Sequence, residues 1–194
     1  LAFSTIGQLS YIVLGIAILS PLSTAGALYH LVAHAFMKIT LFMCAGAIFV
    51  TTHKKDISEM VGLGRRMPVT MSAFTIASLG IAGFPFFVGF VSKANIIMGA
   101  LKTGQLLFGA TLIVSAVLAL TYLMPVVLIT FKREPVNLEF NTYGEASKTM
   151  LVPLLITATV SVILGVAPNF GLHLLDLAMS TGEAVFAHVG GVIC

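Results

Sequence analysis

Charged residues are scarce in this sequence, since only 9% of its 194 residues are Asp, Glu, Lys or Arg. Soluble domains carry about 25% charged residues, which argues against a water-soluble globular fold. The two cysteines, Cys44 and Cys194, are too few for a disulfide framework or a cysteine-rich metal site. The formal net charge is only +3, with the basic residues mostly in loops, so no nucleic-acid partner is expected.

Long apolar runs make up most of the chain, which is 58% hydrophobic with a mean hydropathy of +1.08. A helix that crosses a hydrocarbon core of about 30 Å needs about 20 apolar residues. We therefore predict an all-α membrane protein with about five transmembrane helices. The spans are expected in one transmembrane domain over 1–168, at 1–20, 24–50, 68–101, 105–131 and 149–168. An interfacial or additional C-terminal helix is expected over 169–194.

The third of these runs is too long for one straight span, because its 34 residues would form a helix of about 51 Å. Pro85 removes a backbone donor, and Gly83 and Gly89 on either side of it weaken helix continuity. We predict a discontinuous helix with halves at 69–82 and 90–101. Unwound backbone at this depth needs protein or water around it. A simple proline kink is the alternative.

The loops at 51–67 and 132–148 hold most of the basic residues. Five spans would place both loops on one side of the membrane, which the positive-inside rule makes the cytoplasmic side.

The first apolar run starts without an initiator methionine or a charged flank. We therefore expect a piece of something longer, and no cleaved signal peptide.

Four basic side chains lie inside the apolar runs, namely His30, His34, Lys38 and Lys93. Residues four apart share a helix face and step about 6 Å along the axis, so the first three form a ladder. Imidazole has a pKa of about 6.5 and can both donate and accept a proton. A lysine at mid-bilayer costs about 2.5 to 3.5 kcal/mol, which favours a functional role. These four residues are therefore predicted to form a proton relay.

Two other interpretations of the ladder stay open, a purely structural role for the histidines and a metal site at the His-x-x-x-His pair. The pair has no evident third ligand, because every Asp and Glu lies in a loop or the tail. Lys38, one turn away, would also repel a cation. No bound metal is expected.

Small polar side chains accompany the basic ones. Ser4, Thr5 and Gln8 lie in the first span, and Ser92 directly precedes Lys93. Such groups commonly bond to neighbouring helices, so packing is their default role. Lining a water path between the helices is the alternative role for all four.

Several motifs occur in a fixed order along the chain: LAFSTIGQL at 1–9, HxxxHAFxKxxLF at 30–42, DIxxMxGL at 56–63 and GFPFxxGFxSK at 83–93. This pattern resembles the antiporter-like, proton-translocating subunits of respiratory complex I. It is also similar to the large subunits of Mrp-type cation/proton antiporters and to membrane-bound hydrogenases. The resemblance covers 1–131 and fades beyond Glu134.

The resemblance implies two inverted repeats of five helices, each with a discontinuous helix, of which this chain holds the second half. It assigns Lys93 to the lysine of the second broken helix, near the exit, and His30, His34 and Lys38 to the central relay. The first half, with its glutamate-lysine pair, is absent from this sequence. Many relatives have an acid directly after the broken-helix lysine. Ala94 stands there instead, which leaves Lys93 without a local carboxylate.

The leading functional prediction is a proton-translocating segment of a respiratory-complex subunit. A sodium/proton antiporter subunit of the Mrp type and a non-conducting membrane scaffold are the alternatives. A phosphate-binding loop, a cysteine cluster and a nucleophile-base pair are all lacking, so we predict neither a cofactor nor catalysis by the chain alone. Redox chemistry in an NADH:quinone oxidoreductase-like complex would belong to partner subunits.

The predicted partners are protons, with sodium as the alternative ion, and other membrane subunits that include the first half. The predicted location is a prokaryotic inner membrane, with the mitochondrial inner membrane as the alternative.

Overall fold

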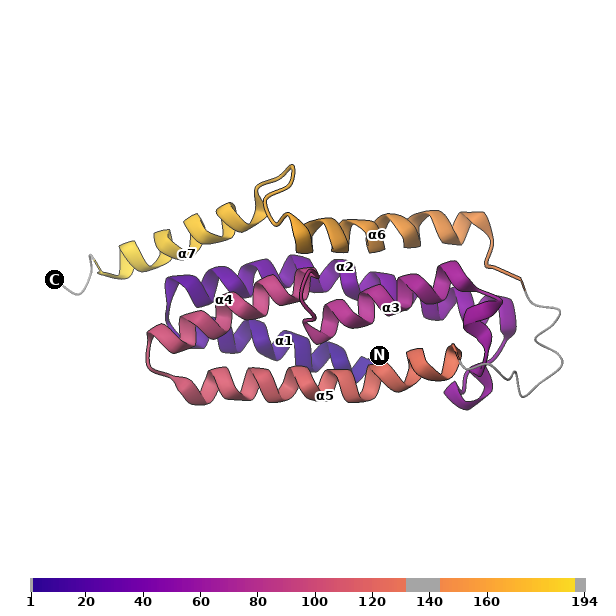
Figure 1. Ribbon diagram of the computed structural model, residues 1–194. Coiled ribbons are helices and arrows are strands. Elements are labelled where there is room, and N and C mark those ends of the chain that lie inside the picture. Colours follow the sequence, from indigo (N-terminus) through magenta and orange to yellow (C-terminus); the bar gives the residue numbers. More distant parts are fainter. Residues whose placement is uncertain (1, 132–143, 191–194) are drawn as a thin grey trace.

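The computed structural model describes residues 2–131 and 144–190, and every regular element in these ranges is helical (Figure 1). The α-helices are α1 (Ala2–Ala17), α2 (Pro21–Thr52), α3 (Pro68–Ala82), α4 (Val88–Lys102), α5 (Leu106–Thr130), α6 (Lys148–Val166) and α7 (Leu174–Gly190). Two 3-10 turns, η1 (Ile57–Met60) and η2 (Leu63–Arg65), lie between α2 and α3. Three helices, α2, α5 and α6, are long and apolar enough to cross a membrane. The predicted all-α membrane fold is confirmed.

The helix ends follow from local chemistry. Pro21 occupies the first turn of α2, where its missing N–H costs no helical hydrogen bond. The helix continues to Thr52 and ends at His53, which takes a left-handed conformation with φ 56°. Its 32 residues span about 48 Å, longer than the predicted span over 24–50.

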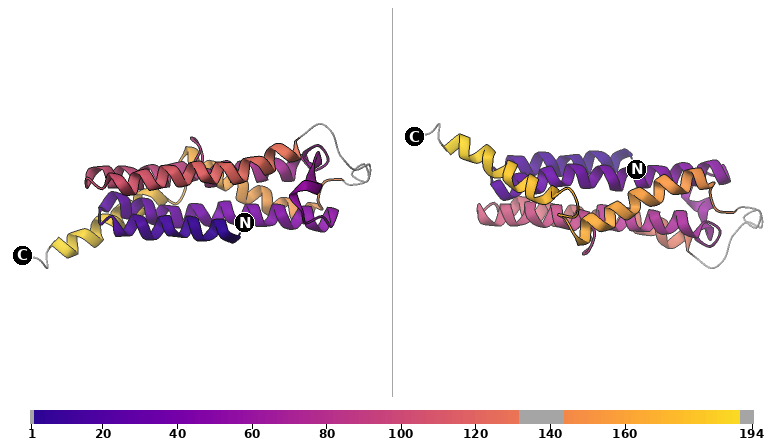
Figure 2. Two further views of the ribbon diagram at one scale, coloured as in Figure 1. Left: turned by 90° about the horizontal axis from the view of Figure 1, so that it is seen from below. Right: turned by 90° about the horizontal axis from the view of Figure 1, so that it is seen from above.

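The central helix of the bundle is α2, which contacts α1, α3, α4, α6 and α7. Figure 2 shows α5 on one side of α2, with α6 and α7 on the opposite side. The α7 helix lies in the predicted C-terminal region, whereas Cys194 and most of the second basic loop lie outside the described residues. The interfacial position of this region and the orientation of the bundle stay predictions.

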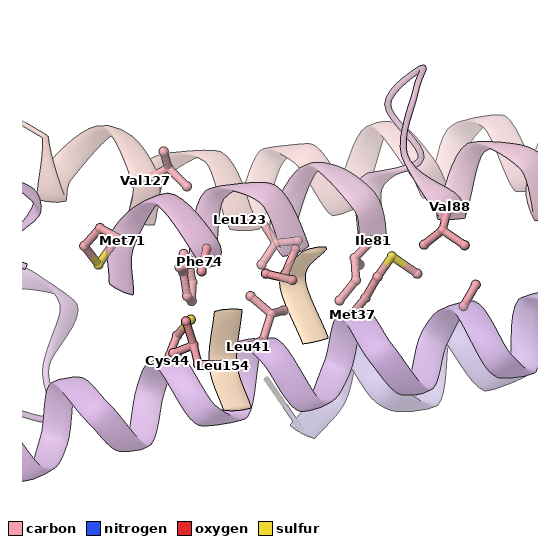
Figure 3. Close-up of a cluster of buried hydrophobic side chains, with 14 of the residues drawn as sticks. Met37, Leu41, Cys44, Met71, Phe74, Ile81, Val88, Leu123, Val127 and Leu154 are labelled. Atoms are coloured by element: carbon pink, nitrogen blue, oxygen red, sulfur yellow. The ribbon is translucent and has the colours of Figure 1, made fainter. Parts of the chain in front are cut away.

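Apolar side chains from six helices, α2 to α7, pack into one core, part of which Figure 3 shows. Met37, Leu41 and Cys44 of α2 are fully buried there. They face residues from the neighbouring helices: Met71, Phe74 and Ile81 of α3, Val88 of α4, Leu123 and Val127 of α5, and Leu154 of α6. This core holds both halves of the discontinuous helix against α2.

The third predicted span is interrupted between α3 and α4, as Figure 1 shows near the middle of the bundle. Gly83 adopts a φ of 87° and donates its N–H to the carbonyl of Gly80, while the Phe84 N–H bonds to the carbonyl of Leu79. This pair of bonds is a Schellman motif, for which glycine is the favoured residue. The predicted break is confirmed, although α4 begins at Val88, two residues before the predicted second half.

Candidate functional site

Lys93 projects from α4 back toward the end of α3. Its side chain is only 4% exposed, and Nζ donates a hydrogen bond of 2.6 Å to the carbonyl of Ile81. That carbonyl belongs to the last turn of α3, where carbonyls lack a partner within the helix. The ammonium also lies 4.9 Å from the centroid of the Tyr11 ring. Lys93 is thus held by a helix end and an aromatic face.

His30 and His34 are stacked on the face of α2 that is turned toward the interior. Their ring centroids are 6.2 Å apart with planes inclined by 22°, and His30 is fully buried. The Nδ1 atom of His30 lies 2.7 Å from the hydroxyl of Ser92. Because that hydroxyl donates its proton to the carbonyl of Gly89, His30 is the donor in the His30–Ser92 contact. With Nδ1 as the donor, Nε2 is the ring nitrogen that accepts a proton when the imidazole is neutral.

The Nε2 atoms of both histidines are buried and lack a hydrogen-bond partner among the described residues. Buried polar atoms in folded proteins are almost always paired with protein or with ordered water. These two nitrogens therefore mark positions where water can bond.

Lys38, at 6% exposure, points to the neighbouring helix α1, where Nζ donates to the hydroxyl of Ser4. Ser4 lines a cavity of about 250 Å³ between α1 and α5. The polar residues in the cavity wall are Ser4, Gln8, Tyr11, Ser115 and Tyr122. Thr5 is half-buried and lies outside this wall, and Ser92 contacts His30 instead. Two of the four predicted lining residues, Ser4 and Gln8, therefore face a cavity.

A second cavity, of about 410 Å³, lies at the break and is lined by Lys93, Gly83, Pro85 and apolar residues of α5. The remaining predicted residue of the break, Gly89, is buried in the first turn of α4. Lys93 thus lines the cavity at the break, whereas Lys38 meets the cavity between α1 and α5 only through its contact with Ser4.

Tyr11 belongs to this site although the charge pattern of the sequence does not single it out. It is 4% exposed, donates to Ser115 on α5, and meets the His30 ring edge-on at a centroid distance of 5.8 Å. Ser4, Gln8 and Tyr11 follow the four-and-three spacing of one helix face, which is the signal that could have indicated it.

We expect the ring of Tyr11, rather than its hydroxyl, to matter most for Lys93. An ammonium over an aromatic ring in a desolvated site gains about 2 kcal/mol. For the proton relay predicted from the sequence, Tyr11→Leu should therefore lower proton translocation about 30-fold. Tyr11→Phe, which keeps the ring, should stay within about twofold of the unchanged protein. Proton uptake by vesicles containing each variant measures this. Equal losses in both variants would assign the effect to the hydroxyl instead.

Within the described residues, no group of three or more His, Cys, Asp or Glu side chains is placed to hold a metal ion. The described residues also include no ion pair between Lys93 and a carboxylate. The bundle contains a discontinuous helix whose second half carries the buried Lys93, close to the stacked histidines of α2. This arrangement is that of an antiporter-like membrane subunit.

Comparison with known proteins supports that class. The chain belongs to the NADH:quinone oxidoreductase/Mrp antiporter transmembrane family, whose profile matches residues 1–121. It is 35% identical over 176 residues to NADH-quinone oxidoreductase subunit N of Desulforudis audaxviator, covering 85% of this chain and 35% of that protein. It is 39% identical over 170 residues to subunit L of Mycobacterium tuberculosis, covering 85% and 26%. The chain therefore spans about a third or less of these relatives.

Solved structures show the same fold. The Mrp complex from Dietzia sp. contains a chain that matches with a TM-score of 0.84 at 22% identity, over 100% of this chain and 44% of that one. Respiratory complex I from Thermus thermophilus matches with a TM-score of 0.80 at 22% identity, over 94% and 38%. The predicted family resemblance is confirmed.

Proposed function

We propose that this chain is the proton-conducting segment of an antiporter-like subunit in a respiratory complex, and that Lys38, His34, His30 and Lys93 carry the protons. The observation that carries this proposal is the series of contacts that runs from His34 to Lys93. His34 stacks on His30, Ser92 joins His30 to the start of α4, and Tyr11 touches both His30 and Lys93. Buried ionisable groups in series within a membrane are typical of proton pathways.

The two lysines serve as the ends of this path. Lys93 lines the cavity at the break, and Lys38 donates to Ser4, which lines the cavity between α1 and α5, so water in these cavities can exchange protons at the two ends. The ammonium of Lys93 donates to the Ile81 carbonyl, at the C-terminal end of α3 where the helix carries partial negative charge. A proton arriving at His30 places a second positive charge nearby, and the repulsion expels the proton of Lys93.

The histidines pass the proton between the ends. A proton accepted at Nε2 of His30 makes both ring nitrogens donors, and loss of the Nδ1 proton or return of the Nε2 proton restores the neutral ring. Water bonded at the two free Nε2 atoms completes the steps that are too long for direct transfer. The path needs no cofactor. Energy for directional transport would come from partner subunits of the complex, in a prokaryotic inner membrane.

Replacing His34 tests the path. Without it, the distance along α2 from Lys38 to His30 is about 12 Å with no titratable group between them. His34→Asn in the intact complex should lower proton translocation about tenfold, equal to about 1.4 kcal/mol in the barrier. The matched control is His53→Asn, because His53 is exposed at the end of α2 and asparagine tolerates its left-handed backbone.

Vesicles that contain the purified complex give the readout, with proton uptake measured against electron transfer. Unchanged translocation in His34→Asn would contradict the relay and favour a non-conducting scaffold. Proton movement that requires sodium on the opposite side of the membrane would instead identify sodium/proton exchange.

A further inference from the structure

The N-terminal end of α3 is capped by a carboxylate from a distant part of the chain. Glu145, just before α6, accepts the backbone N–H of Val69 at 2.8 Å through one oxygen. Its other oxygen accepts the hydroxyl of Thr70 at 2.6 Å and the backbone N–H of Thr70 at 3.4 Å. The residue before the helix, Met67, supplies no side-chain cap. Glu145 therefore acts as the N-cap of α3, although it lies 75 residues from Thr70 in the sequence.

The opposite end of the same helix carries the contact with Lys93. Thus α3 has a carboxylate at its N-terminal end and an ammonium at the Ile81 carbonyl of its C-terminal turn. Both charges have the sign that the helix dipole favours. Neither belongs to α3 itself, since Glu145 precedes α6 and Lys93 lies on α4. The axial position of this helix is consequently set by two charged groups from its neighbours.

The contacts around Thr70 show that this end is held firmly. Thr70 is fully buried, and its carbonyl accepts a hydrogen bond from the Cys44 thiol of α2 at 3.4 Å. Ala146, next to Glu145, is also buried and belongs to the main core. The start of α3 is therefore joined to α2 and to the segment before α6 at one place. A shift of α3 along its axis would break these bonds together.

We propose that Glu145 is a positioning residue, which fixes α3 at the height where the Ile81 carbonyl meets Lys93. The 15 residues of α3 form a rod of about 22 Å, so a displacement at Thr70 is transmitted to Ile81 with little loss. The effect of Glu145 on transport rests on the proposed function, whereas its effect on α3 does not.

Amide hydrogen exchange in the intact complex tests the effect on α3. Glu145→Ala should raise exchange about tenfold at Val69 and Thr70, and also at Gly83 and Phe84 beyond the far end of the helix. Glu145→Gln keeps an acceptor oxygen without the charge and should have a smaller effect at both ends. The control is Glu59→Gln, because Glu59 lies in a different loop and pairs with Lys54. Faster exchange at the near end alone would reduce Glu145 to a local cap and overturn the proposal.

Transport is measured on the same samples. Glu145→Ala should lower proton translocation about fivefold, and Glu145→Gln should restore part of it. Altered exchange at both ends with normal translocation would overturn the link to Lys93. Normal translocation after loss of Lys93 itself would overturn the proposed function, and the exchange result for α3 would then stand on its own.

Discussion

Lys93→Ala is expected to lower proton translocation by the complete complex at least about 100-fold, which corresponds to about 2.7 kcal/mol in the barrier. Lys93 is the titratable group at the far end of the series, and its ammonium is held by one carbonyl and one aromatic ring. Alanine offers no site for a proton there. Assembly should be retained, because the substitution removes a buried charge instead of leaving one unpaired.

Lys93→Arg separates charge from proton transfer. Arginine keeps the positive charge but does not release its proton at cellular pH. The complex with Lys93→Arg should therefore translocate protons as poorly as the complex with Lys93→Ala, although its assembly and the contact of residue 93 with α3 are kept. Lys102→Ala, on an exposed residue of the same helix, should behave like the unchanged protein. Proton uptake in vesicles, normalised to the amount of assembled complex, measures all three. Normal uptake in the alanine variant would contradict the role given to Lys93.

The discontinuous helix could be predicted because its signals are local. Proline and glycine act on the backbone within a turn of their own position, so Pro85 and Gly83 indicate an interruption wherever the chain folds. The start of α4 is earlier than predicted because Gly89 does not break the helix. It lies in the first turn, where the absence of a side chain lets that turn approach α3.

The site could be predicted only in part, for a physical reason. The spacing of His30 and His34 on one helix fixes their separation, and the observed 6.2 Å agrees with a rise of about 6 Å per four residues. Contacts between helices depend on packing that no local pattern encodes. Lys38 could not be joined to Ser4 in advance, nor could Lys93 be placed on the Ile81 carbonyl. The relay role of these residues remains a prediction.

Glu145 is the clearest example of a contact that could not be predicted from the sequence. It lies in a polar segment after the family motifs fade, and its partners Val69 and Thr70 precede it by 76 and 75 residues. The sequence has seven Asp and Glu residues, and no local pattern marks any of them as the cap of a distant helix. Tyr11 differs, because its helical spacing from Ser4 and Gln8 is visible in the sequence. A polar residue on an already polar helix face is thus easier to predict than a contact between distant segments.

Gly89→Ala is expected to cause the largest structural damage of any single methyl addition near the site. A Cβ atom at this position would lie 2.0 Å from the carbonyl oxygen of Gly80, a distance at which the backbone has to move. Overpacking of this kind costs about 1 to 3 kcal/mol, and here the opposing atom is backbone that cannot rotate away. The start of α4 would be pushed from the end of α3, and Ser92 and Lys93 would move with it.

The thermal stability and the yield of the assembled complex measure this effect. Gly46→Ala provides the control, because Gly46 lies inside α2 and a Cβ atom there meets nothing within 4 Å. The control should leave stability unchanged or slightly higher, since alanine favours helix over glycine by about 1 kcal/mol. Wild-type stability in Gly89→Ala would mean that the two half-helices can separate freely. The contact between Lys93 and the Ile81 carbonyl would then not depend on the close approach of α3 and α4. The path proposed for the proton would lose its main structural support.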